Sequence, residues 1–111
     1  MLFRSGTNMK QIERIETMER YLDESAQAIL ALSDALDRYE SIQSSLKKLS
    51  DYYGSTRWMK DFEDDEAGKL PEGLKRGVLS EDAVYDLLTE HHDLMLRMSR
   101  AVTKSIDNKL L

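Results

Sequence analysis

Two adjacent histidines are the side chains in this sequence best suited to acid–base or metal chemistry. His91 and His92 lie in a stretch with helical periodicity, where successive side chains point about 100° apart, so the two rings cannot hold one metal ion. Neither the H-E-x-x-H nor the E-x-x-H spacing of helical metal sites is present. We interpret His91 as part of an apolar helix face and predict no metal or cofactor here.

An acidic run, Glu63 to Glu66 followed by Gly68, has the composition of a calcium-binding loop. Such a loop needs oxygen ligands at alternate positions and a glycine at the sixth, and in every frame a Glu or Ala occupies one of these places. Catalysis would require Asp61 and this run to converge with His91 in a concave pocket. Nothing in the spacing predicts that, so we expect neither a metal site nor an enzyme.

A basic pair, Lys75 and Arg76, comes shortly before the expected start of a helix, where an anion could bind. Glu81 and Asp82 already place negative charge in that first helical turn and would repel an anion. We therefore predict an ionic contact between the basic pair and the acids at 63–66. The pair is also retained as a candidate contact for a partner.

Composition limits the class of protein. The chain has 111 residues, a mass of 12.8 kDa, no cysteine and a net charge of −5, which predict one domain without disulfides and disfavour direct nucleic-acid binding. No stretch is apolar enough to span a membrane, so we expect a cytoplasmic protein. Residues 1–8 share no periodicity with the rest, and we interpret them as a leader or non-native segment before a single domain over 9–111.

Any site must be positioned by the helices that the sequence predicts, and the first of these is long. From Met9 to Tyr53 there is no glycine or proline, and Gly54 stands where a left-handed helix cap is needed, which predicts a helix over 9–53. Its apolar residues recur every three or four positions. Around Tyr39 two successive steps of three occur, and we expect the helix to be overwound or broken there.

A shorter aromatic helix and a loop follow. Ser55 is expected to cap a helix over about 56–64, on which Trp58 and Phe62 are four residues apart and share a face. We predict that these rings and Tyr53 form a lid that packs with Leu79 and Val84. The loop after this helix contains Gly68, Pro71, Gly73 and Gly77.

The last helix has a strong start signal. Ser80 is a good N-cap, and Leu79 before it can pack against Val84 on the fourth helical position, which predicts a helix over about 81–107. The glycines and the proline upstream reverse the chain. The expected fold is therefore all-α, with the long N-terminal helix antiparallel to the C-terminal one and the short aromatic helix and loop between them.

The first helix is longer than its expected partner, and its N-terminal part would remain uncovered. Either a break near Asp23 to Ser25 folds this part back as a third bundle helix, or it pairs with another chain. With no glycine or proline to turn the chain, we favour a continuous helix and self-association. The candidate partner-binding residues are Ile12, Ile15, Met18, Tyr21 and Leu22.

A resemblance supports this view of the fold. The segments "YYGSTRW" and "DDEAGKLPEGLKRGVLSEDAVYDLL" resemble the family of short bacterial proteins called domain of unknown function 4298, and "MKQIERIETMERYLDE" is similar to its usual opening. The resemblance implies a small all-helical protein and no established activity, cofactor or catalytic residue. Because it rests chiefly on Gly73 to Leu88, it favours a partner site in that stretch.

The function that these patterns favour is a small acidic helical module for protein–protein interaction, an adaptor of unknown process. Long amphipathic helices and six methionines are typical of protein contacts. The alternative is an accessory regulator, antitoxin-like or associated with a mobile element, that acts through a protein partner.

Overall fold

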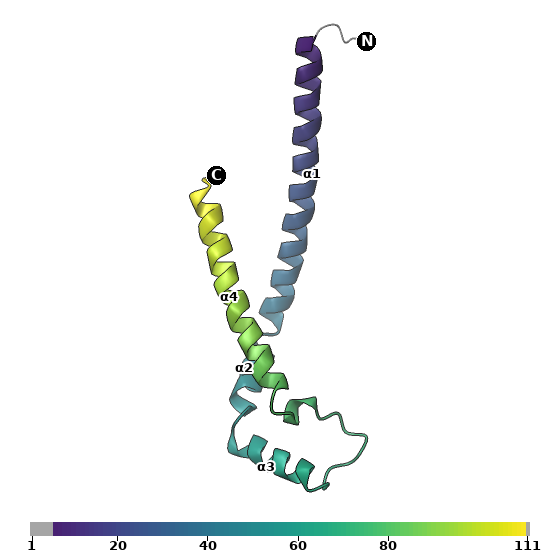
Figure 1. Ribbon diagram of the computed structural model, residues 1–111, viewed down its shortest axis with the longest axis vertical. Coiled ribbons are helices and arrows are strands. Elements are labelled where there is room, and N and C mark those ends of the chain that lie inside the picture. Colours follow the sequence, from purple (N-terminus) through teal and green to yellow (C-terminus); the bar gives the residue numbers. More distant parts are fainter. Residues whose placement is uncertain (1–5, 111) are drawn as a thin grey trace. The chain divides into compact units, whose positions relative to one another are not determined.

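The chain is largely helical over the part that the computed structural model describes, residues 6–110, with side chains described from Asn8 on (Figure 1). No strand occurs within residues 6–110. The predicted all-α class is confirmed. In chain order the elements are α1 (Gly6–Ser41), α2 (Gln43–Tyr52), α3 (Thr56–Glu66), the 3₁₀ turn η1 (Gly77–Leu79) and α4 (Ala83–Asp107).

The chain divides into two units, one ending at Gln43 and one beginning at Ser44. The first unit is α1, a helix of 36 residues that runs without interruption through Asp23–Ser25. The continuous helix predicted at this point is confirmed, and the alternative of a third bundle helix is wrong. Of the interpreted leader, residues 1–5 lie outside the described part, whereas Gly6–Asn8 form the first turn of α1. The antiparallel pairing of the first and last helices joins different units and stays a prediction.

The predicted helix over 9–53 is two helices, because the backbone departs from α geometry at Ile42. There the Ile42 amide donates to the Tyr39 carbonyl at 3.3 Å. This i→i−3 bond closes a 3₁₀-type turn, which is tighter than a turn of α-helix. The Ser41 hydroxyl donates to the Arg38 carbonyl at 2.7 Å, and the Gln43 side-chain amide donates to the Tyr39 carbonyl at 3.4 Å. Side chains that compete for helical carbonyls weaken the ladder, so the break predicted at Tyr39 is confirmed within three residues.

Serine side chains cap the starts of the two remaining helices. The Trp58 amide donates to the Ser55 hydroxyl at 3.2 Å, and this predicted cap starts α3, which runs two residues further than expected, to Glu66. The Ala83 amide donates to the Ser80 hydroxyl at 3.1 Å, which is the capping bond predicted for the last helix. Regular α geometry nevertheless begins at Ala83, two residues later than predicted.

The buried core of the second unit consists of three side chains among the described residues. Trp58, Leu79 and Val84 expose 7%, 6% and 3% of their surface, and they come from α3, η1 and α4 respectively. The turn η1 packs against both α3 and α4. Three of the five residues predicted to meet at the aromatic lid are therefore the ones that the fold buries, and the other two, Tyr53 and Phe62, are half-buried.

Gly54 joins α2 to α3 in a left-handed conformation, with φ +79°. We expect Gly54→Ala to lower the free energy of unfolding by about 1–2 kcal/mol, since a Cβ disfavours this region of φ. Gly73→Ala is the matched control, because Gly73 has no positive φ and a Cβ there meets nothing within 4 Å. Urea unfolding followed by circular dichroism measures both, and an equal effect of the two variants would contradict the prediction.

Candidate functional site

Three aromatic rings gather where α2 ends and α3 begins. Tyr53 meets Trp58 edge to face, with ring centroids 5.3 Å apart and planes at 73°. Phe62, one turn further along α3, stacks on Trp58 with centroids 5.2 Å apart. Both arrangements are favoured by the quadrupoles of aromatic rings. The predicted lid is confirmed as an aromatic cluster.

Two hydrogen bonds connect this cluster to the segment before α4. The Trp58 indole Nε1 donates to the Val78 carbonyl at 3.0 Å. The Tyr53 hydroxyl donates to the Glu81 carbonyl at 2.9 Å. Each bond joins residues at least 20 positions apart in the sequence, so the ring cluster holds the end of α2, α3 and the start of α4 together.

Arg76 closes the long loop between α3 and η1. Its guanidinium donates to the Asp65 carboxylate at 2.5 Å and also to the carbonyls of Pro71 and Leu74. The ion pair is only partly exposed, 34% at the arginine side chain and 22% at the aspartate. This confirms the predicted contact with the 63–66 acids for Arg76, whereas Lys75 is exposed and makes no ion pair within the described chain.

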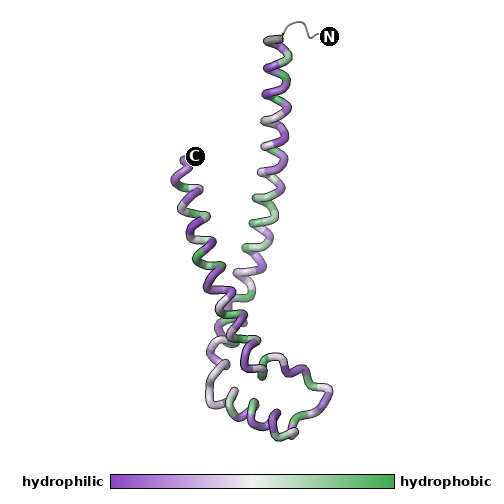
Figure 2. The backbone as a smooth tube through the Cα atoms, viewed as in Figure 1, coloured by the Kyte–Doolittle hydropathy of each residue, from purple (hydrophilic) through white to green (hydrophobic). Residues whose placement is uncertain are grey.

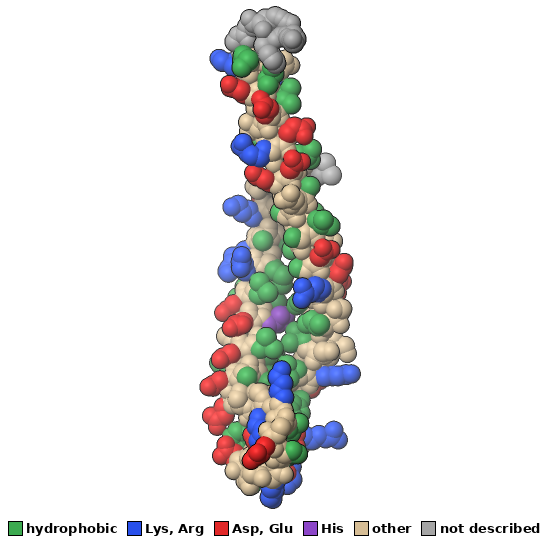
Figure 3. All heavy atoms as spheres, turned by 90° about the vertical axis from the view of Figure 1, so that its right-hand side faces the viewer, with side chains coloured by type: hydrophobic (Ala, Val, Ile, Leu, Met, Phe, Trp, Pro, Cys, Tyr) green, Lys and Arg blue, Asp and Glu red, His purple; other side chains and the backbone are tan. Residues whose placement is uncertain are grey.

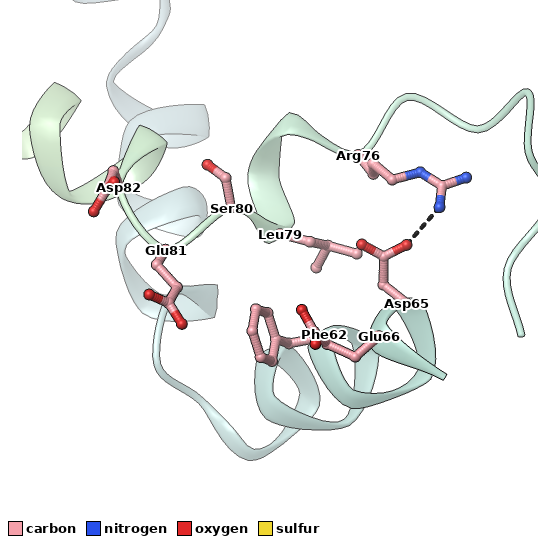
Figure 4. A pocket seen from close by; sticks show the side chains of 8 residues that line it. All are labelled: Phe62, Asp65, Glu66, Arg76, Leu79, Ser80, Glu81 and Asp82. Carbon is pink, nitrogen blue, oxygen red and sulfur yellow. Dashed lines mark hydrogen bonds and ion pairs between the residues drawn. The ribbon is translucent and has the colours of Figure 1, made fainter. Parts of the chain in front are cut away.

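A hollow of about 400 Å³ lies beside this ion pair, between α3 and the segment leading into α4 (Figure 4). In Figure 4 the carboxylates of Glu81 and Asp82 lie on one side of Leu79, and Asp65 and Arg76 face one another on the other side. The lining side chains are Phe62, Asp65, Glu66, Arg76, Leu79, Ser80, Glu81 and Asp82.

The chemistry available in this hollow is ionic and hydrogen-bonding. Four carboxylates outnumber one guanidinium, so its walls are net acidic. The Ser80 hydroxyl is engaged as the acceptor for the Ala83 amide, and Asp65 is paired with Arg76. Within residues 6–110 no three His, Cys, Asp or Glu side chains converge as metal ligands would. The contacts assigned in this hollow are a helix cap and an ion pair, and both connect the segment before α4 to its surroundings.

The hydroxyl of Tyr52 donates to the Asp61 carboxylate at 2.6 Å, which connects α2 with α3. Burial of the phenol raises the pKa of Tyr52 to about 12, and the hydrogen bond to Asp61 and its negative charge act in the same direction. Each of these disfavours the phenolate. The pair is a structural connection at ordinary pH, because the phenol stays protonated and keeps donating.

We expect Tyr52→Phe to lower the free energy of unfolding by about 1.5–3 kcal/mol at neutral pH, since the lost bond has a charged acceptor. The pKa of Tyr52 rises from 10.0 to about 12 on folding, so the stability it contributes is complete below pH 10 and disappears as the pH approaches 12. The stability difference between wild type and variant should shrink over that range.

Urea unfolding of both proteins below pH 10 and near pH 12 measures this change. Tyr85→Phe is the control, because Tyr85 lies on α4 with 60% of its surface exposed. A stability difference for Tyr52→Phe that stays constant across this pH range would contradict the assignment.

Comparison with known protein families identifies the family of this chain. The model of the family described as Domain of unknown function (DUF4298) matches residues 15–101, most of the 111-residue chain. The chain belongs to the DUF4298 family. Neither the comparison with curated proteins nor that with solved structures gave a match. The resemblance stated for the sequence is thereby confirmed.

The match to DUF4298 extends from Ile15 in α1 to Ala101 in α4, so it includes the aromatic cluster, the Arg76–Asp65 pair and the hollow. The family description names no function, and the function must be argued from this chain's own surface. None of the helices within residues 6–110 combines the length and apolar character needed to cross a bilayer.

Five of the seven predicted partner-binding residues of this DUF4298 protein lie on one side of α1, and the other two, Lys75 and Arg76, lie in the loop before η1. Ile15 exposes 51% of its surface and Leu22 62%, while Met18 and Tyr21 are exposed to a similar degree and Ile12 is half-buried. In Figure 2 hydrophobic segments recur along α1 between hydrophilic ones. Charged side chains project from the surface between the hydrophobic ones in Figure 3.

Of the remaining predicted residues, His91 is half-buried on the apolar face of α4, and His92 is exposed. Gly77 begins η1 with an ordinary φ and open space around it, so nothing there requires glycine. The Tyr52–Asp61 pair was not predicted. The two residues lie nine positions apart across the Gly54 turn, a spacing that corresponds to no local rule.

Proposed function

We propose that this DUF4298 protein is a helical protein-interaction module that binds a helix of another polypeptide on the first half of α1 and acts by binding rather than by catalysis. The observation that supports it most is the exposed apolar face of α1. Ile15, Met18 and Leu22 each expose more than half of their surface. A continuous apolar face of this kind on a soluble helix is typical of an interface.

The chain's own last helix is too short to cover the whole of α1. α4 has 25 residues, about 38 Å, and α2 has 10, about 15 Å. The bond from Tyr53 to the Glu81 carbonyl holds the start of α4 beside the end of α2. α1 has 36 residues, about 54 Å, and exceeds the length of α4 by about 16 Å, so α4 leaves part of α1 uncovered in any arrangement.

The apolar residues proposed to bind the partner lie in the first half of α1, from Ile12 to Leu22. Leaving them in water forgoes roughly 25 cal/mol for each Å² of apolar surface, which a partner helix recovers by packing on them. The net charge of −5 disfavours nucleic acid and anionic membranes as the partner. A second helix with its own apolar stripe is the partner that fits.

Recovery of bound protein by an affinity-tagged chain, expressed in the cells that naturally produce it, tests this proposal. Two matched variants place the same charge on different faces of α1: Leu22→Asp on the proposed face and Leu30→Asp away from it, at residues that are 62% and 63% exposed. We expect one defined polypeptide, a second copy included, to be retained by wild type and Leu30→Asp and lost with Leu22→Asp. Equal retention by both variants, or none by wild type, would show the proposal to be wrong.

A further inference from the structure

The apolar residues of α1 follow a seven-residue repeat. With Ile15 as position a of a heptad lettered a to g, the a positions continue every seven residues and the d positions fall three residues after each. Together they read Ile15, Met18, Leu22, Ser25, Ile29, Leu32, Leu36 and Tyr39. Seven of these eight are apolar or aromatic, over more than three heptads. A sustained a/d repeat is the signature of a coiled coil.

The charged residues of α1 respect the same repeat. None of the charged side chains between Lys10 and Glu40 falls at a or d. Nearly all lie at the outer positions b, c and f, where Arg20 and Glu24 form an ion pair along the helix at 3.7 Å. The exceptions, at the positions that flank an a/d seam, are Arg14 at g and Glu19 and Glu40 at e.

Arg14 and Glu19 suit a second copy of the same helix. In a parallel coiled coil the g residue of one helix meets the e residue five positions later on the other. Arg14 of one copy would thus meet Glu19 of the other, and the two-fold symmetry creates the pair twice. Within the described chain neither residue makes an ion pair, although Arg20 and Glu24 on the outer face do.

We propose that the partner of α1 is a second copy of this chain, and that the two copies join through a parallel, in-register, two-stranded coiled coil. This inference rests on the proposed function and names the polypeptide that binds the apolar face of α1. The a/d side chains supply the apolar seam, and the two Arg14–Glu19 pairs favour the parallel register. The seam and its flanks include all five candidate partner-binding residues of α1, since Ile15, Met18 and Leu22 occupy a and d positions and Ile12 and Tyr21 occupy the flanking e and g positions.

Sedimentation equilibrium at micromolar concentration is the first test. We expect wild type to have twice the 12.8 kDa chain mass. Leu22→Asp should raise the dissociation constant of the dimer by about 100-fold or more, because it buries an unpaired carboxylate in the seam. Leu30→Asp places the same charge at position b and should change it little. Circular dichroism of both variants verifies that their helices remain.

Charge exchange tests whether the partner is the same chain in the proposed register. Arg14→Glu and Glu19→Arg should each weaken self-association, because each places like charges opposite one another in the dimer. An equimolar mixture of the two variants should restore association as a heterodimer, in which every g–e pair is again of opposite charge. Failure of the mixture to associate more tightly than either variant alone would overturn the register.

Cysteine crosslinking tests direction, and the chain has no cysteine of its own. Met18→Cys and Ser25→Cys place a thiol in two d layers, and Gln27→Cys places one at the outer position f as the control. Mild oxidation should link both d-layer variants to themselves and leave the control unlinked. An antiparallel pair brings at most one layer opposite itself, so linking of only one layer would exclude the parallel dimer.

The inference and the proposed function can fail separately. A wild-type chain that sediments at 12.8 kDa at every micromolar concentration would overturn the dimer. If tagged wild type and Leu30→Asp then still retain a different polypeptide that Leu22→Asp loses, α1 binds a heterologous helix and the interaction module stands.

Discussion

Replacement of Trp58 by alanine should lower the free energy of unfolding of the second unit by about 3–5 kcal/mol, the range for emptying a buried aromatic site. Trp58 exposes only 7% of its surface, contacts the rings of Tyr53 and Phe62, and donates through Nε1 to the Val78 carbonyl. The variant loses the ring packing and leaves that carbonyl without its donor. Urea unfolding followed by far-ultraviolet circular dichroism measures the change, because the variant has no tryptophan for fluorescence.

Two further variants make this prediction specific. Met59→Ala removes the next side chain along α3, which is 47% exposed, and should change stability by less than about 1 kcal/mol. Trp58→Phe keeps an aromatic ring and removes the indole donor, so it should be intermediate. A loss below about 1 kcal/mol in Trp58→Ala would mean that the ring is a surface or binding residue.

Leu79→Ala should have the second largest effect, a loss of about 2–5 kcal/mol. Leu79 is 6% exposed on η1, the turn that packs against both α3 and α4. Removing its side chain leaves a cavity where three elements meet and takes away the hydrophobic residue that precedes the Ser80 cap. We expect α4 to fray at its start, visible as faster amide exchange near Val84 than in wild type.

Leu74→Ala is the matched control for this prediction. It makes the same change five residues earlier in the loop, where Leu74 is 48% exposed, and should affect stability by less than about 1 kcal/mol. If the two variants lose equal stability, then η1 does not form the core of the second unit.

Local order was predictable from the sequence because it depends on neighbours within one turn. Ser55 and Ser80 accept bonds from amides three residues ahead, and Gly54 takes the left-handed φ that only glycine adopts freely. The irregular step near Tyr39 likewise indicated the break that the structure has at Ile42. The aromatic cluster followed from the i,i+4 spacing of Trp58 and Phe62 and from their position beside the turn.

The periodicity of α1 also determined which residues share its apolar face, since the angle between side chains depends only on their separation along a helix. The residues predicted from Ile12 to Leu22 all lie on this one uninterrupted helix. That the helix runs unbroken past Asp23 was predictable from the lack of glycine and proline. What this face binds depends on a second polypeptide and could not be read from one helix.

The tertiary structure alone decided which charges and hydroxyls pair across the connection between α2 and α4. Four acids at 63–66 were available to the basic pair, and the sequence did not say which would be used. Lys60 lies 3.1 Å from the Asp64 carboxylate and Lys69 lies 4.0 Å from it, so Asp64 is held by lysines. Asp65 projects about 100° further round α3 and meets Arg76 instead.

The direction in which neighbouring side chains project also explains why Tyr52 bonds to Asp61 whereas Tyr53 bonds to the Glu81 carbonyl. Two adjacent tyrosines at the end of a helix point in different directions, and which of them meets α3 and which meets the start of α4 depends on the course of the chain after Gly54. That course is determined by burial of Trp58 against Leu79 and Val84, a cooperative choice between two segments more than 20 positions apart in the sequence.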